Sequence, residues 1–187
     1  MRNITVLTFM IPVGIMSSAS ILVGNNVGAN KIAVGKEYAF LCVKTAIIWA
    51  MGTIALLVLF RDPFVSIFTT QADVRLVIDT AYPVVLIYVF FDCIQCVGQG
   101  IIRGLGKQGR ASIGTVLGYW VIGIPTTLLL VFWLDLGIVG LWVGPTLAIA
   151  FNFCFYYGMV LRTDWQLVAD QAQERRRKEL DGRTGIQ

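Results

Sequence analysis

The chain has 187 residues, of which 57% are hydrophobic and 14% are charged, with a net charge of +4 and no histidine. Soluble domains contain about 45–50% apolar and about 25% charged residues, so this composition excludes an ordinary soluble domain. The sequence shows no histidine, no pairing of a nucleophile with a base and no metal-ligand cluster, which argues against an enzyme and against a bound cofactor. The positive charge lies in short connections and in the C-terminal tail, so it requires no nucleic-acid partner.

Five segments approach the length of about 20 apolar residues that crosses a bilayer as a helix. We therefore predict an all-α, multi-pass membrane protein with five transmembrane helices. The predicted transmembrane domain covers residues 1–161, and residues 162–187 form a cytoplasmic basic tail. The predicted spans are 4–23, 39–60, 76–102, 111–134 and 137–161.

Basic residues in the short connections predict the orientation of the spans, because cytoplasmic loops carry an excess of Lys and Arg. One side of the membrane receives Lys31, Lys36, the basic residues of 103–110 and the tail. On the other side the basic residues are interleaved with Asp62 and Asp73. We therefore expect an external N-terminus and a cytoplasmic C-terminus. An odd number of spans that starts outside predicts that further spans precede this chain in a longer protein. A genuine five-span protein is the alternative.

The first span contains Pro12 and ends in a run of small and amide residues at 23–30. We interpret Gly24, Asn25 and Gly28 as part of a helix end and a tight cytoplasmic loop. The spacing of the two glycines also fits a helix-packing motif. A phosphate-binding loop would need a preceding strand, so nucleotide binding is not expected here.

An external loop is expected after the second span, from Arg61 onward. In this loop Thr70 stands three residues before Asp73, a spacing that predicts a cap for the third helix.

The third span holds Asp92, an acidic residue near the middle of an otherwise uncharged run. A carboxylate at this depth costs about 2.5–3.5 kcal/mol on insertion scales, so such a residue normally faces a polar cavity or a partner. Its neighbours at helical spacing place a polar stripe on one face of the helix. The stripe consists of Tyr88, Asp92, Cys96, Gln99 and Arg103, with Gln95 beside it. We predict that Asp92 binds a proton or a cation; an aspartate hydrogen-bonded only for packing is the alternative.

A compact basic loop follows the third span and contains Arg103, Gly104 and Gly106. In the fourth span Gly123 and Pro125 predict a kink, because proline cannot donate a backbone hydrogen bond.

Three further polar residues could line a cavity with the stripe. Tyr119 belongs to the fourth span, and Asn152 and Tyr156 lie one turn apart in the fifth. For Asn152 and Tyr156 we favour interhelical hydrogen bonding over a role in the cavity.

The tail has a helical face made of Trp165, Val168, Ala169 and Ala172, followed by the basic run 175–178. This pattern indicates a short interfacial helix whose basic end meets anionic lipid. A solvated tail is the alternative.

Four stretches carry a family resemblance. They are Pro12-x-Gly14 with Val23-Gly24-Asn25-x-x-Gly28-Ala29, then Ile67-Phe68-Thr69-Thr70, then Gly100-Ile101-Ile102-Arg103-Gly104-x-Gly106-x-Gln108, and finally Gly118-Tyr119-Trp120-Val121-x-Gly123-x-Pro125 with Gly137-x-x-Gly140-Leu141-Trp142-x-Gly144. Together these stretches resemble the multidrug and toxic compound extrusion (MATE) family, especially its eukaryotic branch. The resemblance covers nearly the whole chain.

The resemblance implies a part of the second lobe, corresponding to core helices eight to twelve of a twelve-helix fold with two pseudo-symmetric lobes. It further implies a secondary active transporter that exports small organic cations, drugs or metabolites in exchange for H⁺ or Na⁺. The first lobe, in the same or another chain, would be a partner, together with the lipid bilayer. Asp92 would bind the proton and the cation in competition. Tyr88, Gln95, Gln99 and Tyr119 would line the cavity.

One departure from the family is that eukaryotic relatives typically carry Glu where this chain has Asp92. A lipid or polysaccharide flippase of the same superfamily is an alternative function, although its cavity would be expected to carry more basic charge. A truncated membrane protein that associates with or regulates a full-length relative is another. Both the plasma membrane and a vacuolar or other internal membrane fit the sequence.

Overall fold

The computed structural model describes the backbone of residues 2–68 and 72–184, and the side chains of residues 9–63, 65, 66 and 75–178. The described chain is helical, with short connections. Five helices in this part are long and apolar enough to cross a membrane, which confirms the predicted fold class. These helices cover Phe9–Gly28, Ile32–Leu59, Arg75–Gly104, Gln108–Trp133 and Gly137–Leu161.

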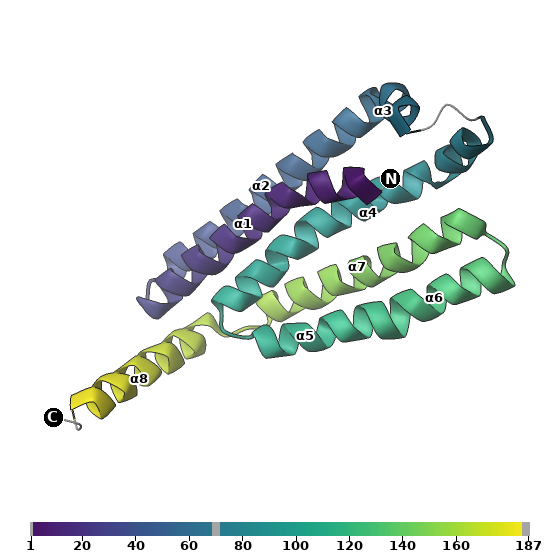
Figure 1. Ribbon diagram of the computed structural model, residues 1–187. Coiled ribbons are helices and arrows are strands. Elements are labelled where there is room, and N and C mark those ends of the chain that lie inside the picture. The colour runs from purple at the N-terminus through teal and green to yellow at the C-terminus, as the bar shows by residue number, and fades with distance from the viewer. Residues whose placement is uncertain (1, 69–71, 185–187) are drawn as a thin grey trace.

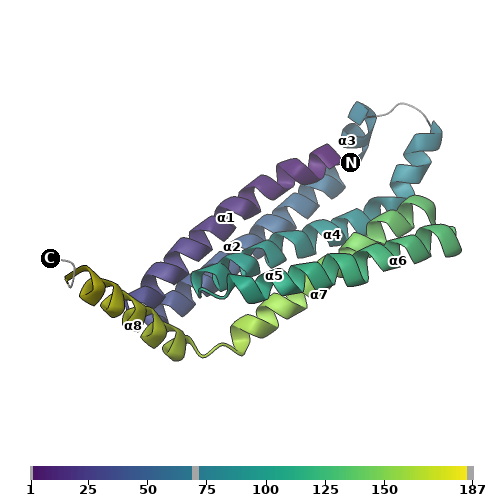
Figure 2. The ribbon, with the colours of Figure 1, turned by 60° about the horizontal axis from the view of Figure 1, so that its bottom comes forward.

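Helix α4 (Ala72–Gly104) is the centre of the bundle (Figures 1 and 2). It packs against α1 (Arg2–Gly28), α2 (Ile32–Leu59) and α7 (Gly137–Leu161). The fourth span begins as α5 (Gln108–Val116), continues through α6 (Ile124–Leu128), and packs on α7. The result is a bundle in which α1 and α2 lie on one side of α4, and α7 with the fourth span lies on the other.

Close approach between α1 and α4 depends on glycine. A Cβ atom built on Gly100 would lie 2.3 Å from the backbone oxygen of Met16. One turn further along α4, a Cβ atom built on Gly104 would lie 2.8 Å from the backbone oxygen of Ser20 and 3.1 Å from the backbone nitrogen of Gly24. Small residues let membrane helices approach closely enough for backbone atoms to touch. The buried cluster beside this contact includes Val23, Val97 and Ile101 of the two helices.

The end of α1 differs from the sequence prediction. Gly24 and Asn25 are helical, so the predicted loop begins later, and α2 starts at Ile32 instead of residue 39. Helix α1 continues through these residues because it packs on α4, and the amide nitrogen of Asn26 donates to the carbonyl of Leu22, four residues earlier, at 2.8 Å. The chain turns at Asn30, which has φ of 58°. Asparagine tolerates this left-handed conformation better than most residues, and it takes the position that glycine often fills.

The segment predicted as an external loop is also largely helical. Helix α3 (Arg61–Phe68) follows α2 directly, and α4 begins at Ala72. Two ion pairs of 2.6 Å, Arg61 to Asp79 and Arg75 to Asp62, connect α3 to the start of α4. Thr70, and with it the predicted cap, lies outside the described residues, as does part of the family-like stretch 67–70.

In the fourth span the structure has widened turns around Pro125. Residues Leu117–Gly123 and Leu129–Trp133 are π-helical, on either side of α6. In the first of these segments the backbone N–H of Ile124 donates to the carbonyl of Tyr119, five residues earlier. The predicted disturbance near Gly123 and Pro125 is therefore a change in hydrogen-bond register that extends over both sides of the proline.

Helix α8 (Trp165–Thr184) leaves the end of the bundle (Figure 2). Asp164 caps it by accepting hydrogen bonds from the backbone N–H groups of Gln166 and Leu167, at 3.0 and 3.2 Å. Trp165 and Ala169 are buried against the ends of α1 and α2. The tail is thus helical as predicted, but the first part of its apolar face is covered by protein instead of lipid.

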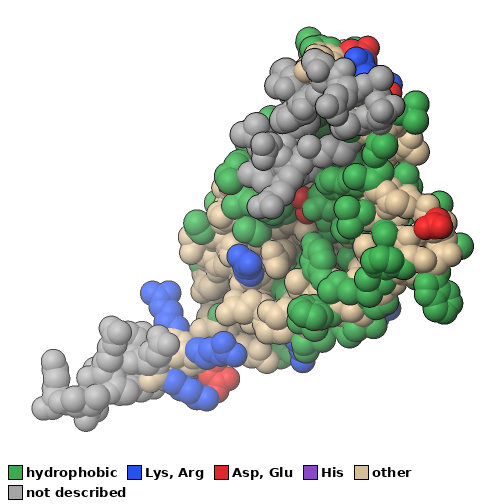
Figure 3. All heavy atoms as spheres, turned by 45° about the vertical axis from the view of Figure 1, so that its right-hand side comes forward, with side chains coloured by type: hydrophobic (Ala, Val, Ile, Leu, Met, Phe, Trp, Pro, Cys, Tyr) green, Lys and Arg blue, Asp and Glu red, His purple; other side chains and the backbone are tan. Residues whose placement is uncertain are grey.

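The two ends of the bundle carry different charges. Hydrophobic side chains cover much of the middle of the face in Figure 3, and Lys and Arg side chains are visible towards the end that carries α8. Lys31 and Lys107 lie at that end, whereas at the other end Arg61 and Arg75 are paired with Asp79 and Asp62, and Asp135 lies in the turn before α7. Which end faces the cytoplasm stays a prediction.

Candidate functional site

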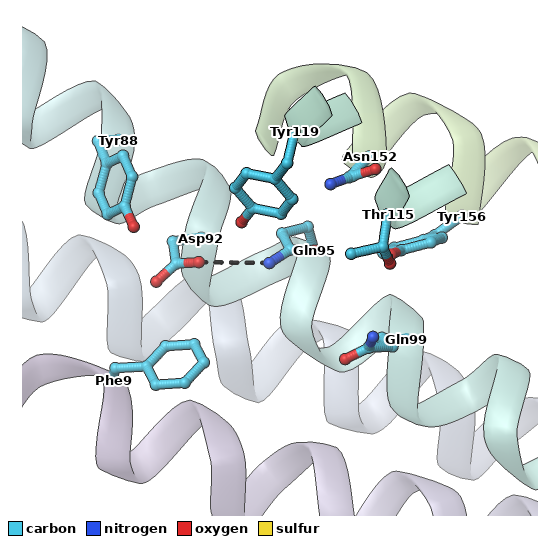
Figure 4. A pocket seen from close by; sticks show the side chains of 9 residues that line it. All are labelled: Phe9, Tyr88, Asp92, Gln95, Gln99, Thr115, Tyr119, Asn152 and Tyr156. Carbon is cyan, nitrogen blue, oxygen red and sulfur yellow. Dashed lines mark hydrogen bonds between the residues drawn. The ribbon is translucent and has the colours of Figure 1, made fainter. Parts of the chain in front are cut away.

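A cavity of about 350 Å³ opens between α1, α4, the fourth span and α7 (Figure 4). Its wall is formed mostly by aromatic, amide and hydroxyl groups. The lining residues are Phe9, Tyr88, Asp92, Gln95, Gln99, Thr115, Tyr119, Asn152 and Tyr156.

Helix α4 provides Asp92, the charged group among the described lining residues, together with three polar neighbours. The amide nitrogen of Gln95 donates to a carboxylate oxygen of Asp92 at 3.3 Å (Figure 4). Spacings of three and four residues bring these side chains to one face of α4, as the sequence predicted. Cys96, assigned to the same stripe, instead faces α1, where its sulfur lies 3.6 Å from that of Met16. Arg103 is exposed at the end of α4.

The facing walls repeat the same spacing. Thr115 and Tyr119 lie four residues apart on the fourth span, and Asn152 and Tyr156 lie four residues apart on α7. The hydroxyl groups of Thr115 and Tyr156 are hydrogen-bonded to each other at 2.6 Å, which joins the two walls. Three helices therefore each turn a pair of residues, i and i+4, towards one space.

Asn152 is notable because its side chain is 1% exposed and both its amide atoms lack a hydrogen-bond partner among the described residues. A buried amide without partners costs about 1–3 kcal/mol. Helix α7 brings Asn152 next to Gly118, where a Cβ atom would lie 2.7 Å from the amide oxygen. The glycine thus makes room for a polar group that still has hydrogen bonds to offer to a molecule in the cavity.

The five residues predicted to bind the cation or to line its cavity all line this cavity: Asp92, Tyr88, Gln95, Gln99 and Tyr119. Phe9 and Thr115 line it as well and were not predicted. The spacing of four residues before Tyr119 was the signal available for Thr115. For Asn152 the favoured interpretation is wrong, because its amide has no hydrogen-bond partner among the described residues. Tyr156 makes the expected interhelical hydrogen bond, and both residues also line the cavity.

The predicted helix-end motif lies elsewhere, at the end of the bundle near α8. Four of its glycines line a separate, smaller pocket of about 160 Å³ beside α8: Gly24, Gly28, Gly104 and Gly106. Gly106 has φ of 68° in the turn between α4 and α5, a conformation that favours glycine.

The chemistry of the lining fits a single positive charge. One carboxylate is surrounded by groups that donate or accept hydrogen bonds and by the rings of Phe9, Tyr88 and Tyr119. Aromatic faces attract organic cations. In the part of the chain that the structure describes, there is no group of three or more His, Cys, Asp or Glu residues that could hold a metal ion.

Comparisons with known proteins agree with this architecture. The sequence profile of the MatE family matches residues 1–129. Human multidrug and toxin extrusion protein 1 is 28% identical over 171 residues, covering 91% of this chain and 30% of the human protein. Mouse multidrug and toxin extrusion protein 2 is 33% identical over 172 residues, covering 89% of this chain and 29% of the mouse protein.

A solved structure shows the same fold. The crystal structure of the eukaryotic MATE transporter AtDTX14 superimposes with a TM-score of 0.87 at 24% sequence identity, covering 92% of this chain and 39% of that one. The chain therefore spans about three tenths of the length of the curated relatives it matches.

Proposed function

Because this chain belongs to the MatE family, we propose that it is a second-lobe part of a secondary active transporter that exports small organic cations in exchange for H⁺ or Na⁺. Its relatives in human and mouse are named for multidrug and toxin extrusion, which supports export as the activity. The five membrane-spanning helices are consistent with this role. The first lobe, in the same or another chain, would complete the transport pathway.

The observation that carries the proposal is the position of Asp92. Its carboxylate lies in a cavity between membrane helices, where a charge is costly unless a partner compensates it. A proton removes this cost by neutralising the carboxylate, and a bound cation removes it by pairing with the carboxylate. The proton and the cation cannot both occupy the carboxylate oxygen atoms at the same time. Because the proton and the substrate compete for one acid, export of the cation would be coupled to movement of the proton in the opposite direction.

The remaining lining would hold the organic part of the substrate. The rings of Tyr88 and Tyr119 offer aromatic faces to a cation, and the amides of Gln99 and Asn152 offer hydrogen bonds. Gln95 would keep the ionised form of Asp92 oriented through its 3.3 Å hydrogen bond. A flippase for anionic head groups would be expected to have basic residues here, and Asp92 is the charged residue of the described lining.

In family members with two lobes, rocking of one lobe against the other would expose such a cavity to each side of the membrane in turn. In this chain α1 contributes Phe9 to the cavity wall, so the cavity extends from the fourth span across α4 to α1. We infer that the first lobe covers the remaining side.

The test is export of a cationic fluorescent dye from vesicles that contain the protein as purified from its own membranes, driven by an imposed pH or sodium gradient. Asp92→Asn should reduce gradient-driven export at least tenfold, and Asp92→Glu should retain part of it. Asp135→Asn is the matched control, because Asp135 lies in the turn before α7 with φ of 51°, which asparagine tolerates. Unchanged export by Asp92→Asn would show that Asp92 has no coupling role. The gradient that drives export distinguishes H⁺ from Na⁺.

A further inference from the structure

A second cavity, of about 470 Å³, lies between α2 and α7. It shares no lining residue with the cavity of Asp92. Ile101 of α4 contributes to its wall, and Trp165 at the start of α8 lines it at one end. We call this cavity the α2–α7 groove. Its volume is within the range of about 300–1,000 Å³ that is typical of small-molecule sites.

The walls of the groove are largely apolar, and the hydroxyl groups of Tyr157 and Thr163 in its lining donate hydrogen bonds to backbone carbonyls. Helix α2 contributes Ala39, Phe40 and Val43, and α7 contributes Val160 and Leu161. Phe40 is 62% exposed and Leu161 is 84% exposed. Both belong to membrane-spanning helices, so in the bilayer these exposed side chains are accessible to lipid. The walls therefore suit a hydrocarbon chain.

One lysine, Lys36, lines the groove, and a second, Lys44, lies beside it over the ring of Phe40. The ammonium group of Lys36 lies 5.9 Å from the ring centre of Trp165, and that of Lys44 lies 4.6 Å from the ring centre of Phe40. Both rings line the groove. Within the described residues neither ammonium has a carboxylate within 4.0 Å. Glu37 and Lys44 both lie outside the groove lining, about 100° and about 80° around α2 from Lys36.

Lys44 is unusual in its depth. It lies twelve residues after the start of α2, about 18 Å along the helix, within the apolar span. Its side chain folds back over Phe40, towards the end of the bundle where Lys36 and Trp165 lie. Lysine extends in this way to reach the head-group level, and tryptophan collects at the same level. A phosphate at that level would give Lys36 a partner, and the Lys44 ammonium extends towards the same level.

We propose that the α2–α7 groove binds an anionic phospholipid of the surrounding leaflet. One acyl chain lies along Val43, Ile101 and Val160, and the phosphate lies within reach of Lys36 and Lys44. The charge complementarity selects an anionic over a zwitterionic head group, since basic pockets between membrane helices bind such lipids. This inference depends on the membrane-embedded fold and is independent of the proposed transport.

The experiment is native mass spectrometry of the protein purified from its own membranes, with palmitoyl-oleoyl phosphatidylglycerol or phosphatidylcholine added at equal concentration. We expect phosphatidylglycerol to bind preferentially. A lysine near a membrane surface changes anionic lipid affinity about fivefold, so Lys36→Gln with Lys44→Gln should weaken binding of phosphatidylglycerol about 30-fold. Binding of phosphatidylcholine should change little.

Arg176→Gln with Arg177→Gln is the matched control, because it removes the same charge from exposed positions on α8 outside the groove. Val43→Trp fills the groove without changing charge and should reduce binding of both lipids. Equal binding of the two lipids by the unmodified protein would overturn the proposal. So would an equal loss in the control, which would indicate diffuse attraction by the tail. Asp92→Asn should bind phosphatidylglycerol normally, which separates this proposal from the transport mechanism.

Discussion

Replacing Gly100 by alanine should destabilise the contact between α1 and α4. The added Cβ atom would lie 2.3 Å from the backbone oxygen of Met16 and 2.9 Å from its Cγ atom, whereas ordinary contacts are 3.4–4 Å. The nearest obstacle is backbone, which cannot rotate away as a side chain can. The two helices would have to separate by about 1 Å, against the packing of a close-packed interface.

The magnitude follows from two opposing effects. Overpacking a close contact costs about 1–3 kcal/mol, and a backbone obstacle places this site towards the upper end. Alanine in a helix is favoured over glycine by up to about 1 kcal/mol, which offsets part of that cost. We therefore expect Gly100→Ala to lower the free energy of unfolding by about 1–2 kcal/mol.

The assay is unfolding in mixed micelles with increasing mole fraction of sodium dodecyl sulfate, followed by tryptophan fluorescence. Gly52→Ala on α2 is the control, because a Cβ atom there would meet nothing within 4 Å. This variant should be as stable as the unmodified protein or more stable. If Gly100→Ala also resists the detergent as well as the unmodified protein, the reasoning from the close helix contact is refuted.

Two further predictions concern the buried amide of Asn152 and the ion pair of Glu174 on α8. Asn152→Leu should raise the stability measured in the same titration by about 1–3 kcal/mol, because it removes buried amide atoms without partners among the described residues. The same variant should slow dye export. Lower stability would mean that the amide is already hydrogen-bonded. At the far end of the chain, the hydrogen bond and positive charge of Lys178 lower the pKa of Glu174 from its ordinary value of 4.5. This pairing stabilises α8 above pH 4.5 and is lost as the pH falls through the folded pKa. A carboxyl NMR titration should give a pKa below 4.5 that returns to 4.5 in Lys178→Gln, and an unchanged value in that variant would contradict the pairing.

The sequence was sufficient for the number of spans and for the polar face of α4. Apolar length predicts a membrane helix directly, and a stripe such as Tyr88, Asp92 and Gln99 follows from the helical period. Helix ends were less predictable. The run around Gly24 and Asn25 contains turn-forming residues, but tertiary packing of α1 on α4 kept them helical.

The residues that line the cavity opposite α4 could not be predicted from the periodicity of a single helix. Spacing places Thr115 on the face of Tyr119, but its packing next to Tyr156 decides that this face lines the cavity. Cys96 fits the stripe by spacing, yet it turns to Met16 because α1 packs against that side of α4. Periodicity assigns residues to a face, whereas the partner of that face depends on how the helices pack.

The π-helical turns of the fourth span determine where the protein would tolerate the deletion of a residue. A π turn holds one residue more in each hydrogen-bonded ring than an α turn. Deleting one residue within Leu117–Gly123 would return such a ring to the α pattern, and the helix on either side would present the same side chains to its neighbours. The same deletion early in α7 would rotate everything after it by about 100° and carry Asn152 and Tyr156 away from the cavity. Length variation in this protein should therefore be absorbed in the fourth span and excluded from α7.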